Sequence, residues 1–407
     1  MPRVFIHMSF FLFMVTAISG LWMRFSSIYP SNMIPYANML HAHSHTAILG
    51  WAFLGVFTVF LALFWTRLRR KKQAVILFCT LFIVTLFMFF AFLDQGYDVF
   101  SIVMSTLHIF IEYWSAVFIY RELSAIPGVS KQGKRYISGA LVALIISSIG
   151  PFSLGFIAAN GLRESALFDM AIYFYLHFQY NGWLFLMLIG LFIFILQKNR
   201  ISHSPLLLNT GFWVYFFSLF PGYFLSVLWV DLGSTPQLFA TIGSIGQWIG
   251  ILCVLFAFKE IWGQLVAHYA RITITGLYIV FALLFLKSTM ELGLILPDLA
   301  NLVYDTRNII IGYLHFTLLG FVSIFIITQL QMTRVIHPYK QIFKVGFVIF
   351  FIGFLWNEFL LFYHGLQTWI SLPALPLFRE SLVGASLLLC IGILVIWRAG
   401  KEKYHIF

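Results

Sequence analysis

The sequence predicts an all-α integral membrane protein of twelve transmembrane helices, built as three pseudo-repeats of four. Three observations lead to this class. Of the 407 residues, 61% are hydrophobic and only 10% are charged, which no soluble domain of this length shows. Apolar stretches long enough to cross about 30 Å of hydrocarbon follow one another along the chain. A histidine motif recurs three times. We therefore expect one polytopic membrane domain over residues 1–407.

Twelve apolar stretches reach the length of about 20 residues that a membrane-spanning helix needs. Each is expected to be helical because lipid offers no partners to backbone polar groups. The first stretch follows a single Arg3 and lacks a small-residue cleavage site, so it is expected to be retained rather than removed as a signal peptide. The predicted spans are 4–24, 38–66, 74–93, 98–122, 136–159, 166–197, 205–229, 236–258, 271–292, 309–332, 341–364 and 381–398.

The net charge of +11 at pH 7 is distributed unevenly between the two sides of the predicted membrane domain. The connections after odd-numbered spans hold only Arg24, Arg163, Arg307 and Arg379, whereas the other connections and both termini hold most of the 25 Lys and Arg residues. The positive-inside rule then predicts cytoplasmic termini, in a plasma (inner) membrane. The basic residues indicate topology and contact with anionic membrane lipid, and no nucleic-acid partner is expected.

The recurring motif is a histidine followed five residues later by glycine and then by an aromatic residue. Its copies are His45–Gly50–Trp51, His177–Gly182–Trp183 and His315–Gly320–Phe321, separated by 132 and 138 residues. They fall in the second, sixth and tenth predicted spans. A four-helix unit therefore repeats with the same orientation, over approximately 1–130, 131–265 and 266–407.

The three histidines are expected about 10–18 Å from the outer ends of their helices, at the helical rise of 1.5 Å per residue, and therefore in the outer half of the membrane. An ionisable group at that depth indicates a site. Two imidazoles suit a haem iron between them, and the glycines allow a ring or a neighbouring helix to approach closely. We therefore expect at least one b-type haem, held by His45 and His315. The alternative is that both histidines only hydrogen-bond across helices.

With these motifs the chain resembles subunit I of the haem-copper oxidase superfamily, the cytochrome oxidases and nitric oxide reductases. The resemblance implies low-spin haem ligation by His45, in H-T-A-I-L-G-W, and by His315, in Y-L-H-F-T-L-L-G-F. It places His177 at a copper-binding position. Tyr313 replaces the family's high-spin haem ligand, and the segment 206–229 lacks the remaining copper ligands. A second haem or metal stays open, since tyrosine can ligate haem iron, but copper is not supported.

The resemblance implies a respiratory haem protein that transfers electrons or that binds or reduces a diatomic gas, nitric oxide or oxygen. The stretch from His43 to Trp51 also resembles the haem- and copper-containing membrane proteins of the bacterial nitric oxide response. The sequence has no CxxCH site, so electrons are expected from an external donor or a quinol. Oxidoreductase turnover, a non-catalytic gas-sensing or assembly role, and accessory subunits all stay open.

Other polar residues in or beside the spans are candidates for supporting roles. If the protein is catalytic, electrons are expected to pass from the first haem to a second centre near His177 and Tyr313. His108 and Glu112, four residues apart on one helix face, supply its protons or form a structural pair. His41 shares a face with His45, whereas His43 points elsewhere. Either histidine is expected to reach a haem propionate, to bind a second metal, or to be solvated. The outward-side arginines are further candidate propionate partners, and the sequence does not choose among Arg24, Arg163, Arg307 and Arg379.

The competing class is a secondary transporter without haem. Lys287 and Glu291 have the spacing of an internal ion pair, and Glu358 is an isolated acid in the eleventh span. A transporter should depend on Lys287 or Glu358, whereas a haem protein should depend first on the repeat histidines. The spans show little of the Gly and Pro interruption expected at the midplane substrate site of a transporter, although Pro151 and Pro221 are candidates for such breaks.

Overall fold

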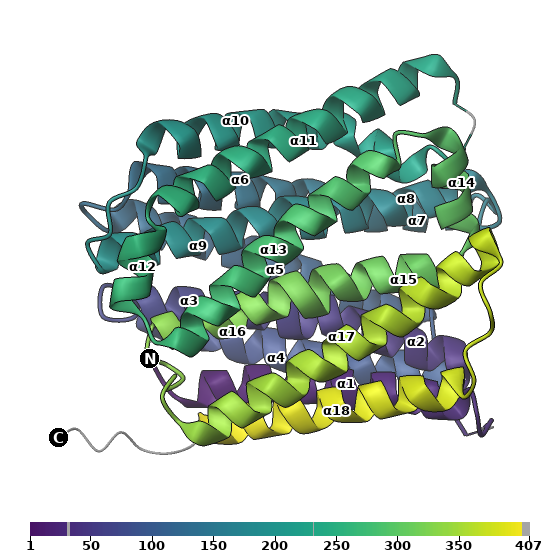
Figure 1. Ribbon diagram of the computed structural model, residues 1–407, viewed down its shortest axis with the longest axis horizontal. Helices are drawn as coiled ribbons and strands as arrows, with labels where there is room; N and C mark the ends of the chain where they lie inside the picture. The colour runs from purple at the N-terminus through teal and green to yellow at the C-terminus, as the bar shows by residue number, and fades with distance from the viewer. Residues whose placement is uncertain (31–32, 231, 401–407) are drawn as a thin grey trace. The chain divides into compact units, whose positions relative to one another are not determined.

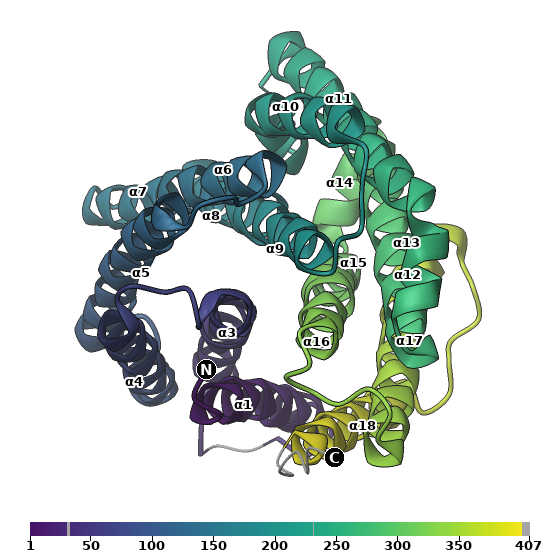
Figure 2. The same ribbon diagram turned by 90° about the vertical axis from the view of Figure 1, so that its left-hand side faces the viewer.

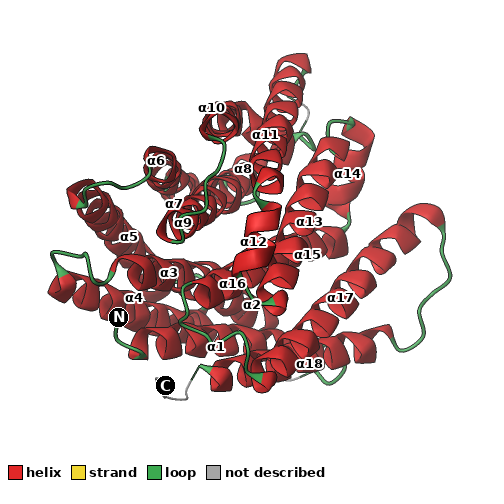
Figure 3. Ribbon diagram, turned by 60° about the vertical axis from the view of Figure 1, so that its left-hand side comes forward, coloured by secondary structure: helices red, strands yellow, loops and turns green. Residues whose placement is uncertain are grey.

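A computed structural model describes residues 1–30, 33–230 and 232–400 of the chain. All regular structure in these ranges is helical (Figure 3). Twelve of the helical segments described are long and apolar enough to cross a membrane. The prediction of a multi-pass helical protein with twelve spans is therefore confirmed. Residues 401–407, which belong to the predicted cytoplasmic C-terminus, lie outside the described residues.

The chain forms two compact units, and the first joins the two ends of the sequence. It consists of Met1–Ile126 and Ile326–Phe407. Its helices are α1 (Val4–Ser26), α2 (Tyr36–His45), η1 (Thr46–Ala52), α3 (Phe53–Phe64), α4 (Lys71–Gln95), α5 (Val99–Ala125), α17 (Gln341–Ile370) and α18 (Phe378–Ala399). Helix α16 (Ser323–Met332) begins in the second unit and ends in the first.

The second unit, Pro127–Phe325, is continuous in sequence. Its helices are α6 (Lys131–Ser147), α7 (Ile149–Ala159), α8 (Ala166–His177), η2 (Phe178–Leu184), α9 (Phe185–Lys198), α10 (Pro205–Gly222), η3 (Tyr223–Val227), α11 (Ser234–Glu260), α12 (Trp262–His268), α13 (Arg271–Gly293), α14 (Pro297–Asp305), α15 (Arg307–His315) and η4 (Phe316–Val322). Helices α12 and α14 are short segments in connections and were not predicted.

Neighbouring helices in each unit are paired by large apolar side chains. In the first unit, α4 lies beside α5, and α1 packs on α18 and on η1 (Figures 1 and 2). The rings of Phe13 and Trp51 stack there with centroids 4.0 Å apart. In the second unit, α10 pairs with α11 and α6 with α9. The motif aromatics Trp51 and Trp183 are both buried, so they pack within the protein.

Each histidine of the repeat ends an α-helix and is followed directly by a seven-residue π-helix. The π-helices are η1, η2 and η4, and each contains the glycine and the aromatic residue of its motif. The three spans that contain them are also the most buried of the twelve. A π-helix is rare and often marks a functional position. The sequence repeat is therefore also a repeat of backbone conformation.

Both candidate prolines lie at interruptions of their spans. Helix α6 ends at Ser147 and α7 begins at Ile149, two residues before Pro151. Pro221 lies in the last turn of α10, which continues as the 3-10 helix η3. Proline lacks the backbone N–H that a continuous helix needs, which explains the changes of conformation. The prediction of breaks at these two positions is confirmed.

Candidate functional site

The imidazole of His45 is held in a defined orientation by the turn that precedes it. Its Nδ1 lies 2.9 Å from the carbonyl oxygen of His41, to which only a protonated nitrogen can donate. The lone pair therefore lies on Nε2, which accepts a hydrogen bond from the Tyr97 hydroxyl at 3.1 Å. The ring also packs on Phe92, with centroids 4.4 Å apart. His45 thus presents its Nε2 as an acceptor.

The neighbouring histidines on α2 lie in different surroundings. The His41 ring contacts Tyr97 edge-on, with centroids 4.5 Å apart, so His41 and His45 share one aromatic neighbour. His43 instead bonds to α1, where its Nδ1 lies 2.9 Å from the carbonyl oxygen of Thr16 and 3.0 Å from Ser19 Oγ. The predicted division of these histidines between two faces of the helix is therefore seen.

His108 and Glu112 form a fully buried pair on α5. His108 Nδ1 lies 2.9 Å from Glu112 Oε1, and their side chains are 0% and 3% exposed. His108 Nε2 is 3.3 Å from Thr85 Oγ1, whose own proton is donated to the carbonyl oxygen of Leu81 at 2.8 Å. The Nε2 therefore donates to Thr85. A single proton then lies between Nδ1 and Oε1, and the pair has no net charge.

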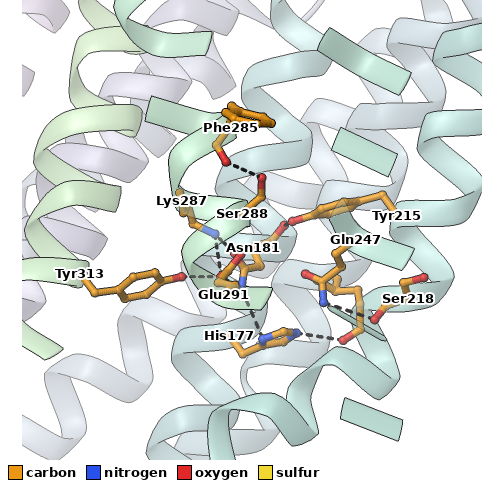
Figure 4. Close-up of polar contacts among 11 residues, drawn as sticks. His177, Asn181, Tyr215, Ser218, Gln247, Phe285, Lys287, Ser288, Glu291 and Tyr313 are labelled. Atoms are coloured by element: carbon orange, nitrogen blue, oxygen red, sulfur yellow. Dashed lines mark hydrogen bonds and ion pairs between the residues drawn. The ribbon is translucent and has the colours of Figure 1, made fainter. Parts of the chain in front are cut away.

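In the second unit, a polar network joins the second and third sequence repeats. Tyr313 of α15 donates to Glu291 Oε1 at 2.5 Å, and Lys287 Nζ lies 2.8 Å from the same oxygen (Figure 4). Lys287 also donates to Asn181 Oδ1 at 2.5 Å. The Lys287 side chain is 4% exposed and that of Glu291 is 13% exposed. The predicted Lys287–Glu291 ion pair is present, in contact with residues of two other helices.

His177 lies at the edge of this network with both ring nitrogens hydrogen-bonded to protein. Its Nε2 donates to the carbonyl oxygen of Leu219 at 2.9 Å, which leaves Nδ1 to accept from Asn181 Nδ2 at 3.4 Å. The structure thus brings His177 and Tyr313 into one hydrogen-bond network through Asn181 and Glu291. In this arrangement neither nitrogen of His177 is presented to a metal.

Two further predicted residues lie on α15. His315 is its last residue and is partly buried, two positions after Tyr313 and therefore on another face. Arg307 is its first residue and is exposed, about 12 Å along the helix axis from His315 at 1.5 Å per residue. His45 belongs to the first unit and His315 to the second.

The glycines of the first two motifs allow neighbouring helices to approach. A Cβ atom at Gly50 would lie 2.9 Å from Thr85 Cγ2 on α4, and one at Gly182 would lie 2.6 Å from the Cβ of Ala143 on α6. The sequence left open whether these glycines allow a ring or a neighbouring helix to approach. The contacts at Gly50 and Gly182 are both with neighbouring helices. Gly50 also brings η1 against Thr85, the residue that binds His108.

Sequence reasoning missed Asn181 and Tyr97, which connect the predicted residues. Asn181 follows its motif histidine by four residues, where the other repeats have Leu49 and Leu319. A polar residue at one of three otherwise apolar repeat positions was a usable signal. Tyr97 gives no such signal, because it lies in a short connection whose contact with α2 depends on tertiary structure.

Comparison with known proteins does not identify the chain. No protein-family model matches it, and a search of curated proteins finds no relative. Within residues 1–30, 33–230 and 232–400, no three His, Cys, Asp or Glu side chains converge as metal ligands would.

Proposed function

We propose that this chain is a haem-binding membrane protein in which His45 is an axial ligand of a b-type haem. The observation that carries the proposal is the hydrogen bond from His45 Nδ1 to the His41 carbonyl oxygen. It leaves the Nε2 lone pair available, and metal-ligating histidines typically donate their other ring N–H to a carbonyl or carboxylate oxygen in this way. Haem binding would replace one hydrogen bond, that of Tyr97, whose side chain is 48% exposed.

The three-fold recurrence of histidine and π-helix supports a haem-copper oxidase-like architecture, and His315 remains our proposed second axial ligand. The haem would supply electron transfer or the binding of nitric oxide or oxygen. The chain's own residues would hold protons and exclude water. His108 and Glu112 share one buried proton within the unit of His45. The His177–Tyr313 network offers a second polar centre, and we assign no metal to it.

The reduced-minus-oxidised visible spectrum of the detergent-purified protein tests this proposal, with carbon monoxide added afterwards. The wild type should show a low-spin haem signal, which His45→Ala and His315→Ala should lose. His43→Ala is the matched control, because this histidine lies on the same helix and bonds to α1, and it should keep the signal. A wild-type protein that stays colourless when expressed with ample haem would refute haem binding.

A secondary transporter is the second candidate, favoured by the buried Lys287–Glu291 pair and the helix breaks at Pro151 and Pro221. Charged residues and interrupted helices at membrane depth commonly line transport sites. The same preparation separates the two candidates. A transporter would be colourless, and Lys287→Met rather than His45→Ala would abolish its proton-coupled uptake.

A further inference from the structure

The connection between α3 and α4 is basic and is held in place by the end of α5. Five of the six residues in the run 67–72 are Lys or Arg. The backbone N–H of Arg69 donates to Glu122 Oε2 at 2.7 Å, and the Arg69 guanidinium group donates to the carbonyl oxygen of Ala125 at 3.2 Å. Both acceptors lie in the last turn of α5. The two hydrogen bonds therefore bring the basic run beside Arg121, which precedes Glu122 in the chain.

Four cations at this place carry more charge than the neighbouring acid can balance. They are exposed, and the ion pairs found among the described residues include none of them. We call these four residues the basic patch: Arg70, Lys71, Lys72 and Arg121. The acid beside them is Glu122, which is 2% exposed and bonded to the backbone of Arg69. One carboxylate offsets at most one of the four charges, so the basic patch has a net positive charge.

An exposed apolar stripe continues from the basic patch along each of the two adjacent helices, α4 and α5 (Figure 2). Residues three, four or seven apart share a helix face. On α4 the face that begins with Lys72 continues with Ile76, Ile83, Phe87 and Phe90, and on α5 the face that ends with Arg121 contains Val103, Leu107, Phe110, Trp114 and Val117. Each of these apolar side chains is at least 39% exposed. Each stripe is about 27 Å long at 1.5 Å per residue, close to the thickness of the hydrocarbon layer.

We propose that the basic patch binds the headgroup of an anionic phospholipid, whose acyl chains lie along the stripes of α4 and α5. The charge distribution in the sequence predicts only a general attraction to anionic lipid, whereas the structure places four cations at the same end of two apolar stripes. A phospholipid matches both the charge and the stripes. Each Lys or Arg beside the membrane surface raises the affinity for anionic lipid by roughly fivefold. The site does not depend on haem binding, because none of its residues is a proposed haem ligand.

Native mass spectrometry of the delipidated full-length protein tests the site, because it counts bound lipid molecules during a titration. Phosphatidylglycerol is the anionic probe and phosphatidylcholine the zwitterionic one. The wild type should bind its first phosphatidylglycerol at least about tenfold more tightly than phosphatidylcholine. Replacing all four residues of the basic patch by glutamine should remove this preference. The charge-matched control replaces four exposed cations of the second unit by glutamine and should keep the preference: Lys131, Lys198, Lys259 and Arg271.

Two further measurements separate lipid binding from a folding defect and from the binding of a free anion. The double variant Arg70→Lys/Arg121→Lys keeps the charge of the basic patch and should keep the preference for phosphatidylglycerol. Inorganic phosphate should not displace the bound lipid, because it has no acyl chains to contact the stripes. A wild type without the preference, an equal loss in the control variant, or displacement by inorganic phosphate would each overturn the proposal.

Discussion

Individual ionisable residues inside the spans are arranged so that charge is shared or cancelled. His108 and Glu112 hold one proton between them, and Lys287 lies against Glu291. The low dielectric of the interior makes a single unpaired charge expensive, whereas a matched pair is tolerated. Glu358 is the exception, because its second oxygen has no partner among the described residues.

Removing one partner of the Lys287–Glu291 pair should destabilise the protein more than removing both. Lys287→Met should cost about 3–5 kcal/mol of unfolding free energy, because it leaves a buried carboxylate uncompensated. The double variant Lys287→Met/Glu291→Gln should recover part of this loss. Denaturant unfolding in detergent measures the effect. Lys259→Met, at an exposed position, should change stability by no more than about 0.5 kcal/mol. Strictly additive losses would show that the pair is not coupled.

The three spans that contain π-helices are the most buried of the twelve. In each, the π-helix starts directly after the motif histidine. The extra residue of a π-helix changes the angular position of everything that follows. The histidine and the following apolar segment can therefore face different neighbours. At Gly50 and Gly182 the same turns touch adjacent helices, so the motif combines a polar group with tight packing.

Substitution of Gly182 by alanine should therefore destabilise the protein, and a second substitution at the contacting residue should restore the lost stability. The new Cβ would lie 2.6 Å from the Cβ of Ala143, and such overpacking costs about 1–3 kcal/mol. Adding Ala143→Gly should restore most of the stability. Gly155→Ala is the control, since no atom lies within 4 Å of that Cβ position. Thermal unfolding in detergent measures all three variants, and a failure of Ala143→Gly to compensate would contradict the packing argument.

For the whole molecule, the distribution of basic residues predicts the orientation of all twelve spans. The structure supports the number of spans, while the side on which each connection lies is a prediction from charge alone. The first and last spans, Val4–Ser26 and Phe378–Ala399, both belong to one compact unit. Twelve is an even number, so the two termini should lie on the same side of the membrane.

Cysteine labelling of intact cells tests this orientation. In a background without Cys79, Cys253 and Cys390, a cysteine replacing Glu164 should react with a membrane-impermeant maleimide. One replacing Lys131 should react only after the membrane is permeabilised. Both positions are exposed and lie outside or at the ends of helices. Differences in burial should therefore not determine which of the two cysteines reacts. The opposite labelling pattern would invert the predicted topology.

The sequence by itself determined the helical class, the twelve spans, their approximate limits and the three-fold histidine motif. These features follow from local hydropathy and from spacing along the chain, which need no knowledge of distant contacts. Tertiary structure alone decided three sets of hydrogen bonds. Tyr97 donates to His45, His108 donates to Thr85, and Asn181 bonds to both His177 and Lys287. Each of these contacts joins residues from different helices or connections. Because a hydrogen bond depends on where separate helices place their side chains, hydropathy and spacing along one chain do not specify it.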